Sequence, residues 1–454
     1  MVSKDTFIFW KNYLNPNRDL MKLWQKEATD IDQLFERFTI GNDPILDLEI
    51  AEYDVIASRA HVSMLSSIDL LSKSEEEEIL GGLDEILVSI KDGTFEIEQG
   101  IEDCHSQIEL LLTRKIGEAG KKVHSGRSRN DQVLVALKLY AKSEIESIVK
   151  KIEGFFGLLQ EKSERSKMVL MPGYTHMQVA MPSSFGLWFG AHAESLIDDL
   201  LILKAAYQIA DKNPLGSAAG YGSSFPLDRE MTTKEMGFSA LNYNVIYAQM
   251  TRGKLERACA MAIGAVAGTL GKFCMDVCTY AGPDYGFFDL DKKFTTGSSI
   301  MPHKHNPDGF ELVRAKCNQL QALPTEINLI LANLSTGYHR DLQILKESFI
   351  KGFSTLKDCL DILCAMTENL DVNKELINDK KYDLLFTVEE VNRLVLEGVP
   401  FRDAYKQVGD RVNTGEYEPN REIEHTHIGS IGNLANDQIK EAFEKTIRGF
   451  GFNS

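Results

Sequence analysis

Residues 128–165 decide the fold and read SRNDQVLVALKLYAKSEIESIVKKIEGFFGLLQEKSER. No proline interrupts them, and apolar side chains recur at alternating steps of four and three residues, the spacing of one face of a long helix. These apolar positions are Ala141, Ile145, Ile148, Ile152, Phe155 and Leu159. Because a long apolar stripe must be covered by other helices, the segment predicts a helix bundle.

Helical patterns continue on both sides of this segment. Residues 183–212 and 245–281 are unbroken in pattern, and the second is lined with Ala, Met, Cys and Gly, a composition that lets helices pack closely. Shorter helices are expected at residues 20–38, 50–71 and 75–91. Strand patterns are scarce. We therefore predict an all-α fold with a central long-helix bundle that assembles into an oligomer. The predicted domains are three mostly helical regions, residues 1–125, 126–373 and 374–454.

The composition is that of a globular protein and excludes some partners. Of 454 residues, 43% are hydrophobic and 26% charged, and the formal net charge is −17. Such a charge disfavours nucleic acid, because phosphate binding needs a basic surface. No apolar run approaches the roughly 20 residues of a membrane helix, and the N-terminus lacks a secretory core segment. We expect a cytoplasmic protein with no membrane contact.

The seven cysteines point to buried thiols. None forms a C-x-x-C pair, and most lie in apolar helical patterns. Cys274 and Cys278 are one helical turn apart, but no nearby His or Cys completes a zinc set. The sequence therefore predicts free cysteines and no metal site.

Residues 297–308, GSSIMPHKHNPD, carry a dense set of reactive side chains. Pro302 and Pro307 argue against a continuous helix here, so the segment is expected to be a shaped polar loop. Asn306 is expected to be the N-cap of a following helix with Pro307 at its first position. Serine, lysine and histidine together suit proton transfer and carboxylate recognition. An ordinary exposed polar loop is the alternative.

Three other segments each allow a structural interpretation and a functional one, in which they bind or act on a substrate. Ser128 and Asp131 fit a capping box, whereas Arg127 and Arg129 beside a helix start suit a carboxylate. The pair Thr175-His176 lies between two prolines and is expected in a loop before a helix, although a lone histidine is more often structural than catalytic. Residues 338–346 follow the pattern of an amphipathic helix start with solvated charges.

Two of these motifs resemble a known family. Residues 297–308 closely resemble the signature loop of the fumarase/aspartase superfamily of homotetrameric lyases. Residues 124–132, HSGRSRNDQ, resemble the corresponding segment of the argininosuccinate lyases. Further likeness at residues 102–106, 214–216 and 398–402 extends the resemblance over most of the chain.

The resemblance implies a reaction and a site. The reaction is the β-elimination of argininosuccinate to arginine and fumarate, with no metal or organic cofactor, in active sites shared between subunits of a homotetramer. Ser298 would be the base on the Cβ proton, and Lys304 would stabilise the dianion that forms. His176, oriented by Glu311, would protonate the leaving nitrogen. The implied substrate-binding residues are Ser128, Arg129, Asn130, Thr175, Asn306, Tyr338, Gln343 and Lys346.

The chain also departs from the argininosuccinate lyase pattern. Asp43 stands where a serine is expected, and His303 and His305 stand where glutamine and lysine are usual. His303-Lys304 is similar to adenylosuccinate lyases, so adenylosuccinate lyase or another fumarate-releasing lyase is an alternative. A non-catalytic, crystallin-like structural protein is a further alternative, which the presence of all the implied catalytic side chains disfavours.

Overall fold

The computed structural model describes residues 33–452, and these form two compact units. Unit 1 takes the described residues up to Leu137 together with Pro214–Leu241. Unit 2 takes Lys138–Asn213 and the described residues from Asn242 onward. The chain therefore leaves each unit and returns to it. The three-domain division expected from the sequence stays a prediction.

Unit 1 is built from short and medium helices. They are α2 (Gln33–Ile40), α3 (Asp43–Leu46), α4 (Ala51–Ser67), α5 (Lys73–Lys91), α6 (Cys104–Ile116), α7 (Glu118–Lys121), α10 (Arg229–Glu235) and the 3₁₀ helices η2 (Asp47–Glu49) and η3 (Lys122–His124). The helices predicted at 50–71 and 75–91 are confirmed as α4 and α5. Of the helix predicted at 20–38, residues 20–32 lie outside the described part of the chain.

The start of α5 shows how local sequence fixes a helix end in unit 1. The Ser72 hydroxyl accepts the Glu75 N–H (3.3 Å), and the Glu75 carboxylate accepts the Ser72 N–H (2.9 Å). This reciprocal cap satisfies two backbone groups that would otherwise lack partners. The charged residues that follow lie on the solvent side, while Ile79, Leu83 and Ile86 are buried.

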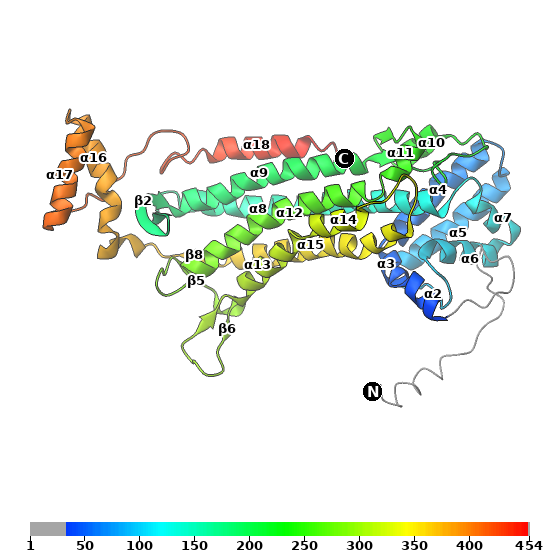
Figure 1. Cartoon of the computed structure of the whole chain (residues 1–454), viewed down its shortest axis with the longest axis horizontal. Coiled ribbons are helices and arrows are strands. Elements are labelled where there is room, and N and C mark those ends of the chain that lie inside the picture. Colours follow the sequence, from blue (N-terminus) through cyan, green and yellow to red (C-terminus); the bar gives the residue numbers. More distant parts are fainter. Residues whose placement is uncertain (1–32, 453–454) are drawn as a thin grey trace. The chain divides into compact units, whose positions relative to one another are not determined.

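Unit 2 contains the long helices of the bundle. Most of α8 (Arg129–Arg165) lies here, with α9 (Phe185–Ala210), α11 (Val245–Met250), α12 (Lys254–Tyr280), α13 (Asp308–Leu320), α14 (Leu323–Leu331), α15 (Leu345–Glu368), α16 (Thr387–Leu396), α17 (Phe401–Thr414) and α18 (Asn436–Arg448). The 3₁₀ helices are η4 (Lys292–Phe294), η5 (Arg340–Ile344), η6 (Leu376–Asn378) and η7 (Lys380–Phe386). In Figure 1, helices α8, α9, α12 and α15 run side by side, and α16 and α17 form an outlying pair within unit 2.

The bundle core uses the apolar seam predicted for α8. All six of its predicted apolar positions are buried, each with no more than 1% of its surface exposed. Phe155 of α8 meets Phe273 of α12 edge to face at 5.6 Å, and α12 also packs against α9, α13, α14 and α15. The all-α fold is confirmed. The cysteines are free, and five of the seven are buried.

The segment predicted as one helix at 245–281 is two helices. Helix α11 ends at Met250, and α12 begins at Lys254 after Gly253, whose φ is +79°. A side chain at Gly253 would be strained at this φ and would meet Leu331 at 2.3 Å. The prediction of a continuous helix is wrong because a left-handed glycine breaks it.

The strands are short, and they contribute little to the fold, in line with the scarcity of strand patterns in the sequence. They are β1 (Leu170–Thr175), β2 (Gln178–Ser184), β3 (Lys212–Asn213), β4 (Ala240–Leu241), β5 (Phe288–Leu290), β6 (Thr296–Gly297), β7 (His305–Asn306) and β8 (Leu370–Val372). Within unit 2, β1 pairs with β2, β5 with β8 and β6 with β7, all antiparallel. The β1–β2 and β6–β7 hairpins matter most, because they carry predicted catalytic residues.

Helix α12 is long and apolar enough to cross a membrane by length and composition alone. However, 56% of its most apolar window is buried by the rest of unit 2. Four other helices of the unit pack against it. We therefore interpret α12 as the central core helix of the bundle.

Candidate active site

The start of α8 in unit 1 carries three predicted substrate-binding residues, Ser128, Arg129 and Asn130. The Ser128 hydroxyl accepts the Asn130 N–H (3.3 Å), and the Ser128 N–H donates to the Asp131 carboxylate (2.9 Å). One half of the predicted capping box is therefore present, the bond from Ser128 N–H to Asp131, while the Ser128 hydroxyl caps the N–H of Asn130 and not that of Asp131. Substrate binding by the same residues is compatible with the cap and stays a prediction.

The two arginines beside this helix start have different surroundings. Arg127 is buried, its Nη1 donates to the Ser58 hydroxyl (2.9 Å), and burial lowers the pKa of its guanidinium. Arg129 is half-buried, with Nη2 donating to the Ser106 hydroxyl (3.0 Å) and Nε 3.4 Å from the Asp103 carboxylate. Arg127 therefore serves the interior of unit 1, and Arg129 is the better placed of the two to meet a ligand.

Asp131 has a second role that the sequence does not reveal. Its Oδ2 accepts the N–H groups of Gly216 (3.0 Å) and Ala218 (2.8 Å), which have φ values of +82° and +51°. Burial raises the pKa of Asp131 to about 6, while these N–H groups act in the opposite direction. The carboxylate holds a strained turn against α8. No local motif signals a contact between residues 85 positions apart.

Histidines near this helix start are kept neutral by their surroundings. Burial and the positive charge of Arg127 hold the pKa of His61 well below its usual value, and its Nε2 lies 2.8 Å from the Ser125 carbonyl oxygen. Burial, followed by Arg127 and Arg129, lowers the pKa of His124 to about 4. This part of unit 1 therefore resists taking up further positive charge.

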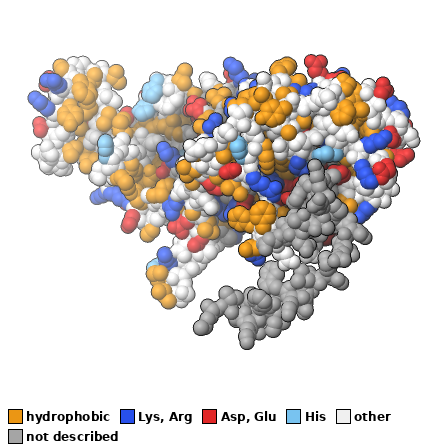
Figure 2. Space-filling view, turned by 45° about the vertical axis from the view of Figure 1, so that its right-hand side comes forward, with side chains coloured by type: hydrophobic (Ala, Val, Ile, Leu, Met, Phe, Trp, Pro, Cys, Tyr) orange, Lys and Arg blue, Asp and Glu red, His pale blue; other side chains and the backbone are white. Residues whose placement is uncertain are grey.

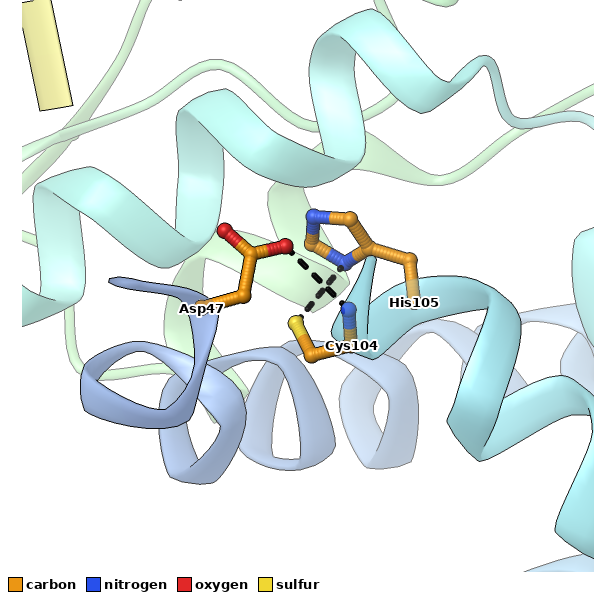
Figure 3. A group of neighbouring side chains, drawn as sticks. All are labelled: Asp47, Cys104 and His105. Carbon is orange, nitrogen blue, oxygen red and sulfur yellow. Dashed lines mark hydrogen bonds between the residues drawn. The ribbon is translucent and has the colours of Figure 1, made fainter. Parts of the chain in front are cut away.

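A second buried group in unit 1 consists of Asp47, Cys104 and His105, whose potential metal-ligating atoms lie within 4.8 Å of one another (Figure 3). Several polar atoms of this group are already hydrogen-bonded, although the buried His105 Nε2 has no partner in the described part of the chain. The Asp47 carboxylate accepts the Cys104 N–H (3.1 Å), and His105 Nδ1 lies 2.9 Å from the carboxylate of Asp54 and 3.7 Å from Cys104 Sγ. The group could supply three metal ligands, but its contacts are those of a buried polar network that joins η2 to α6.

In unit 2, Thr175 and His176 lie at the tip of the β1–β2 hairpin. Thr175 pairs with Gln178, so His176 and Met177 form the two-residue turn, with φ values of +52° and +60°. Residues other than glycine, asparagine and aspartate are uncommon at these positions of a two-residue turn. The backbone of His176 and Met177 is therefore strained. The turn exposes His176 at the end of a rigid hairpin. The sequence predicts a loop here, and the structure has a hairpin.

Ser298, Lys304 and Asn306 lie on the β6–β7 hairpin. The Ser298 Oγ accepts the N–H groups of Met301 (3.1 Å) and Ile300 (3.4 Å), and Lys304 is exposed. The polar, non-helical segment predicted at residues 297–308 is confirmed, and the short strands β6 and β7 flank its loop.

The helix start after this hairpin differs from the prediction. Asn306 belongs to β7, and its Nδ2 donates to the Thr296 hydroxyl (3.4 Å). The N-cap of α13 is Pro307. The prediction that Asn306 caps α13 is wrong, because strand pairing with β6 takes Asn306 and the helix begins one residue later.

Glu311 lies in the first turn of α13 and is exposed. Its carboxylate is 3.7 Å from Nη2 of Arg314, one turn further along. In the described part of a single chain, Glu311 and His176 form no hydrogen bond with each other. Pairing of His176 with Glu311 stays a prediction.

The third segment of unit 2 with predicted contacts to substrate spans η5 and the start of α15. Tyr338 has 37% of its surface exposed, Gln343 is half-buried in η5, and Lys346 is buried in the first turn of α15. The sequence pattern alone suggests solvated charges here, so the burial of Lys346 is a finding that only the fold provides.

These segments do not converge within one copy of unit 2. Strands β1 and β2 pack against η6 and η7, which follow the C-terminal end of α15. Lys346 lies at the opposite end of this 24-residue helix, about 35 Å away along its axis. Figure 1 shows the β1–β2 hairpin and the start of α15 at opposite ends of the bundle, with the β6–β7 hairpin apart from both.

Comparisons with known proteins agree with this architecture. A family model described as "Lyase" matches residues 26–322. An argininosuccinate lyase of Bacteroides fragilis is 55% identical over 95% of this chain and 96% of its own length. One from Parabacteroides distasonis is 56% identical with the same coverage. This chain belongs to the argininosuccinate lyase family.

Membership of the family confirms the resemblance that the two sequence motifs indicate. The fold agrees as well. A crystal structure of class II fumarase from Schistosoma mansoni superposes with a TM-score of 0.72 and 16% identity, covering 92% of this chain and 95% of the fumarase. At that identity the match concerns the fold alone. The family thus rests on the sequence relatives, and the helical architecture rests on the structure.

Proposed function

We propose that this chain is a carbon–nitrogen lyase that cleaves argininosuccinate into arginine and fumarate, as a step of arginine biosynthesis. The observation that carries the proposal is identity of 53–56% to argininosuccinate lyases over 95% of the chain. Every side chain that the family resemblance assigns to the reaction is present at its position. We place the reaction in the cytoplasm, with no cofactor, membrane or nucleic acid involved.

The reaction must remove a weakly acidic carbon-bound proton next to a carboxylate. Ser298 is assigned as the base. Two backbone N–H groups point at its Oγ and would stabilise the negative charge of an alkoxide, which makes an otherwise poor base more effective. Lys304 and Asn306 on the same hairpin would stabilise the dianion that forms when the proton leaves.

The second half of the reaction breaks the bond to the guanidinium nitrogen. His176 is assigned as the acid that protonates this nitrogen, and the strained turn that exposes it supports this role. Thr175 beside it would hold a substrate carboxylate. Tyr338, Gln343 and Lys346 would hold the rest of the substrate, with Ser128, Arg129 and Asn130 at the start of α8.

The separation of these groups supports active sites assembled from several chains. Because α15 alone keeps Lys346 about 35 Å from the end where the Thr175-His176 hairpin packs, one copy of unit 2 cannot close a site around a small molecule. An antiparallel neighbour would place one end of its bundle beside the other end of the first. We therefore propose a homotetramer with shared active sites.

The surface of unit 2 supports association of this kind. Figure 2 shows hydrophobic side chains among charged ones over the visible face of the molecule. Large apolar side chains are exposed on the bundle helices, among them Leu201, Ile202, Met261, Met275, Leu312, Leu329 and Ile362. Apolar side chains on several faces of long helices are typical of surfaces that other copies cover.

Turnover tests the proposal directly. Purified protein incubated with argininosuccinate should release fumarate, followed by its ultraviolet absorbance, together with one equivalent of arginine. Adenylosuccinate is the control substrate, because His303-Lys304 is similar to adenylosuccinate lyases. Release of fumarate from adenylosuccinate but not from argininosuccinate would replace this proposal with the alternative. Light scattering on the same sample should give the mass of four chains.

A further inference from the structure

Arg252 forms a buried clamp between the start of α12 and η5. Its Nε lies 2.6 Å from Oε1 of Glu256, and the two side chains are only 4% and 1% exposed. Its Nη2 donates to the main-chain carbonyl of Leu342 at 2.8 Å. One guanidinium thus bonds a carboxylate on α12 and the backbone of η5 in fixed directions, which its planar fork allows.

The carboxylate of the clamp is itself fixed. The second oxygen of Glu256 accepts the Gly253 N–H at 2.6 Å, at the break between α11 and α12. The charge of Arg252 is therefore matched by a buried partner that the backbone holds in place. Arg252 thus acts as a structural connection between two elements and is not free to bind an anion directly.

The segment that the clamp holds carries predicted substrate-binding residues on both sides of Leu342. The Leu342 side chain packs with Ala260, Ile327 and Leu345 in a small apolar cluster. Leu342 also lines a cavity of about 240 Å³, together with Arg252, His339 and the cluster's neighbours Leu331 and Leu334. Apolar packing therefore holds the Leu342 side chain, and the Arg252 guanidinium is the polar tie that holds its main-chain carbonyl beside this cavity.

We propose that Arg252 is a positioning residue that sets the backbone of η5 and, through it, the directions of Tyr338, Gln343 and Lys346 toward substrate. The inference rests on the proposed function, which makes these three residues substrate contacts. A misplacement of about 1 Å in a substrate-positioning residue can cost up to roughly 100-fold in reaction efficiency. Loss of the bond to Leu342 should therefore weaken substrate binding without removing any group that reacts.

Arg252→Lys tests this role with little risk to folding. A lysine can still pair with Glu256, but its single ammonium group cannot also hold the Leu342 carbonyl in the same geometry. We expect KM for argininosuccinate to rise about tenfold while kcat stays within about threefold of the unchanged protein. Arg252→Met, which removes both bonds, should show the larger KM effect if the tetramer still forms.

Arg411→Lys is the matched control. Arg411 of α17 bonds the buried Glu390 of α16 at 2.6 Å, and neither residue is one of the predicted site residues. This variant should keep KM and kcat unchanged while reporting what the same exchange costs in thermal stability. An equal rise in KM in both variants would overturn the positioning role, as would an unchanged KM in Arg252→Lys. A fall in kcat without a change in KM would also overturn it.

The assay separates this inference from the proposed function. If the unchanged protein does not release fumarate from argininosuccinate, the proposed function fails and the inference fails with it. If the unchanged protein is active and Arg252→Lys has the same KM, the inference alone fails. Measuring the reverse reaction with arginine and fumarate extends the test, because a binding defect should then appear in a KM and not in kcat.

Discussion

The hairpin loop that carries Ser298 and the start of α8 are built in opposite ways. The loop is exposed, with Ile300 showing 83% of its surface, and its bonds are a few backbone turns around Ser298 and Met301. The start of α8 is enclosed, and Asp131 alone accepts three backbone N–H groups. The predicted base thus lies on a loosely held segment, and three predicted binding residues lie on a segment locked in place.

This contrast predicts that changes in the loop alter turnover and changes at the helix start alter stability. Ser298→Ala removes the assigned base while leaving a loop that holds little of the fold. We expect kcat to fall about 10³-fold, as for loss of a general base, with the melting temperature unchanged. The measurement is fumarate release beside a thermal melt.

Ser299→Ala is the control for this prediction, because it is the adjacent serine on the same loop. It should keep kcat within about threefold of the unchanged protein. Loss of turnover in Ser299→Ala with near-normal rates in Ser298→Ala would show that the neighbouring serine is the base. A large fall in melting temperature in either variant would contradict the view that this loop is loosely held.

Asp131→Ala should have the opposite signature. It leaves the N–H groups of Ser128, Gly216 and Ala218 without their acceptor in a buried place. We expect the free energy of unfolding to fall by about 3 kcal/mol, measured by urea denaturation. Asp131→Asn keeps an acceptor oxygen and should cost less. A stability equal to that of the unchanged protein would show that the helix start is not locked by this carboxylate.

The smallest effect expected is a pH dependence from His124. Its pKa is lowered from 6.5 to about 4 in the folded protein, so the unfolded chain binds a proton that the folded chain rejects. This contribution to stability is complete above about pH 6.5 and is lost as the pH falls toward 4. Allowing for the partial exposure of His124, it amounts to about 2 kcal/mol.

His124→Asn should therefore flatten the decline of stability between pH 6.5 and 4, measured by urea denaturation at several pH values. His427 is exposed, whereas His124 is half-buried, so His427→Asn provides the control substitution. That control should leave the decline unchanged. A decline equally steep in His124→Asn and in the unchanged protein would place the titrating group elsewhere, for example at the buried His61.

Prediction from sequence worked best where the signal is local. The apolar seam of α8 repeats at helical spacing over six positions, and all six are buried. The prolines at 302 and 307 predict a loop, and the structure has one. Prediction failed at Gly253, where a contact with a residue distant in the chain decides the conformation, and at Asn306, where a strand of only two residues is too short to show a pattern. The left-handed Gly253 faces Leu331, and Asn306 pairs with Thr296.

The sequence by itself determined the helical class, the family and the identities of the reactive side chains, because periodicity and motifs are properties of neighbouring residues. Only the tertiary structure decided that Asp131 holds the turn at Gly216 and that Arg252 ties α12 to η5. Tertiary structure also put the Thr175-His176 hairpin and Lys346 at opposite ends of unit 2. Such contacts depend on the alignment of the long helices in space, and no short stretch of sequence encodes that alignment.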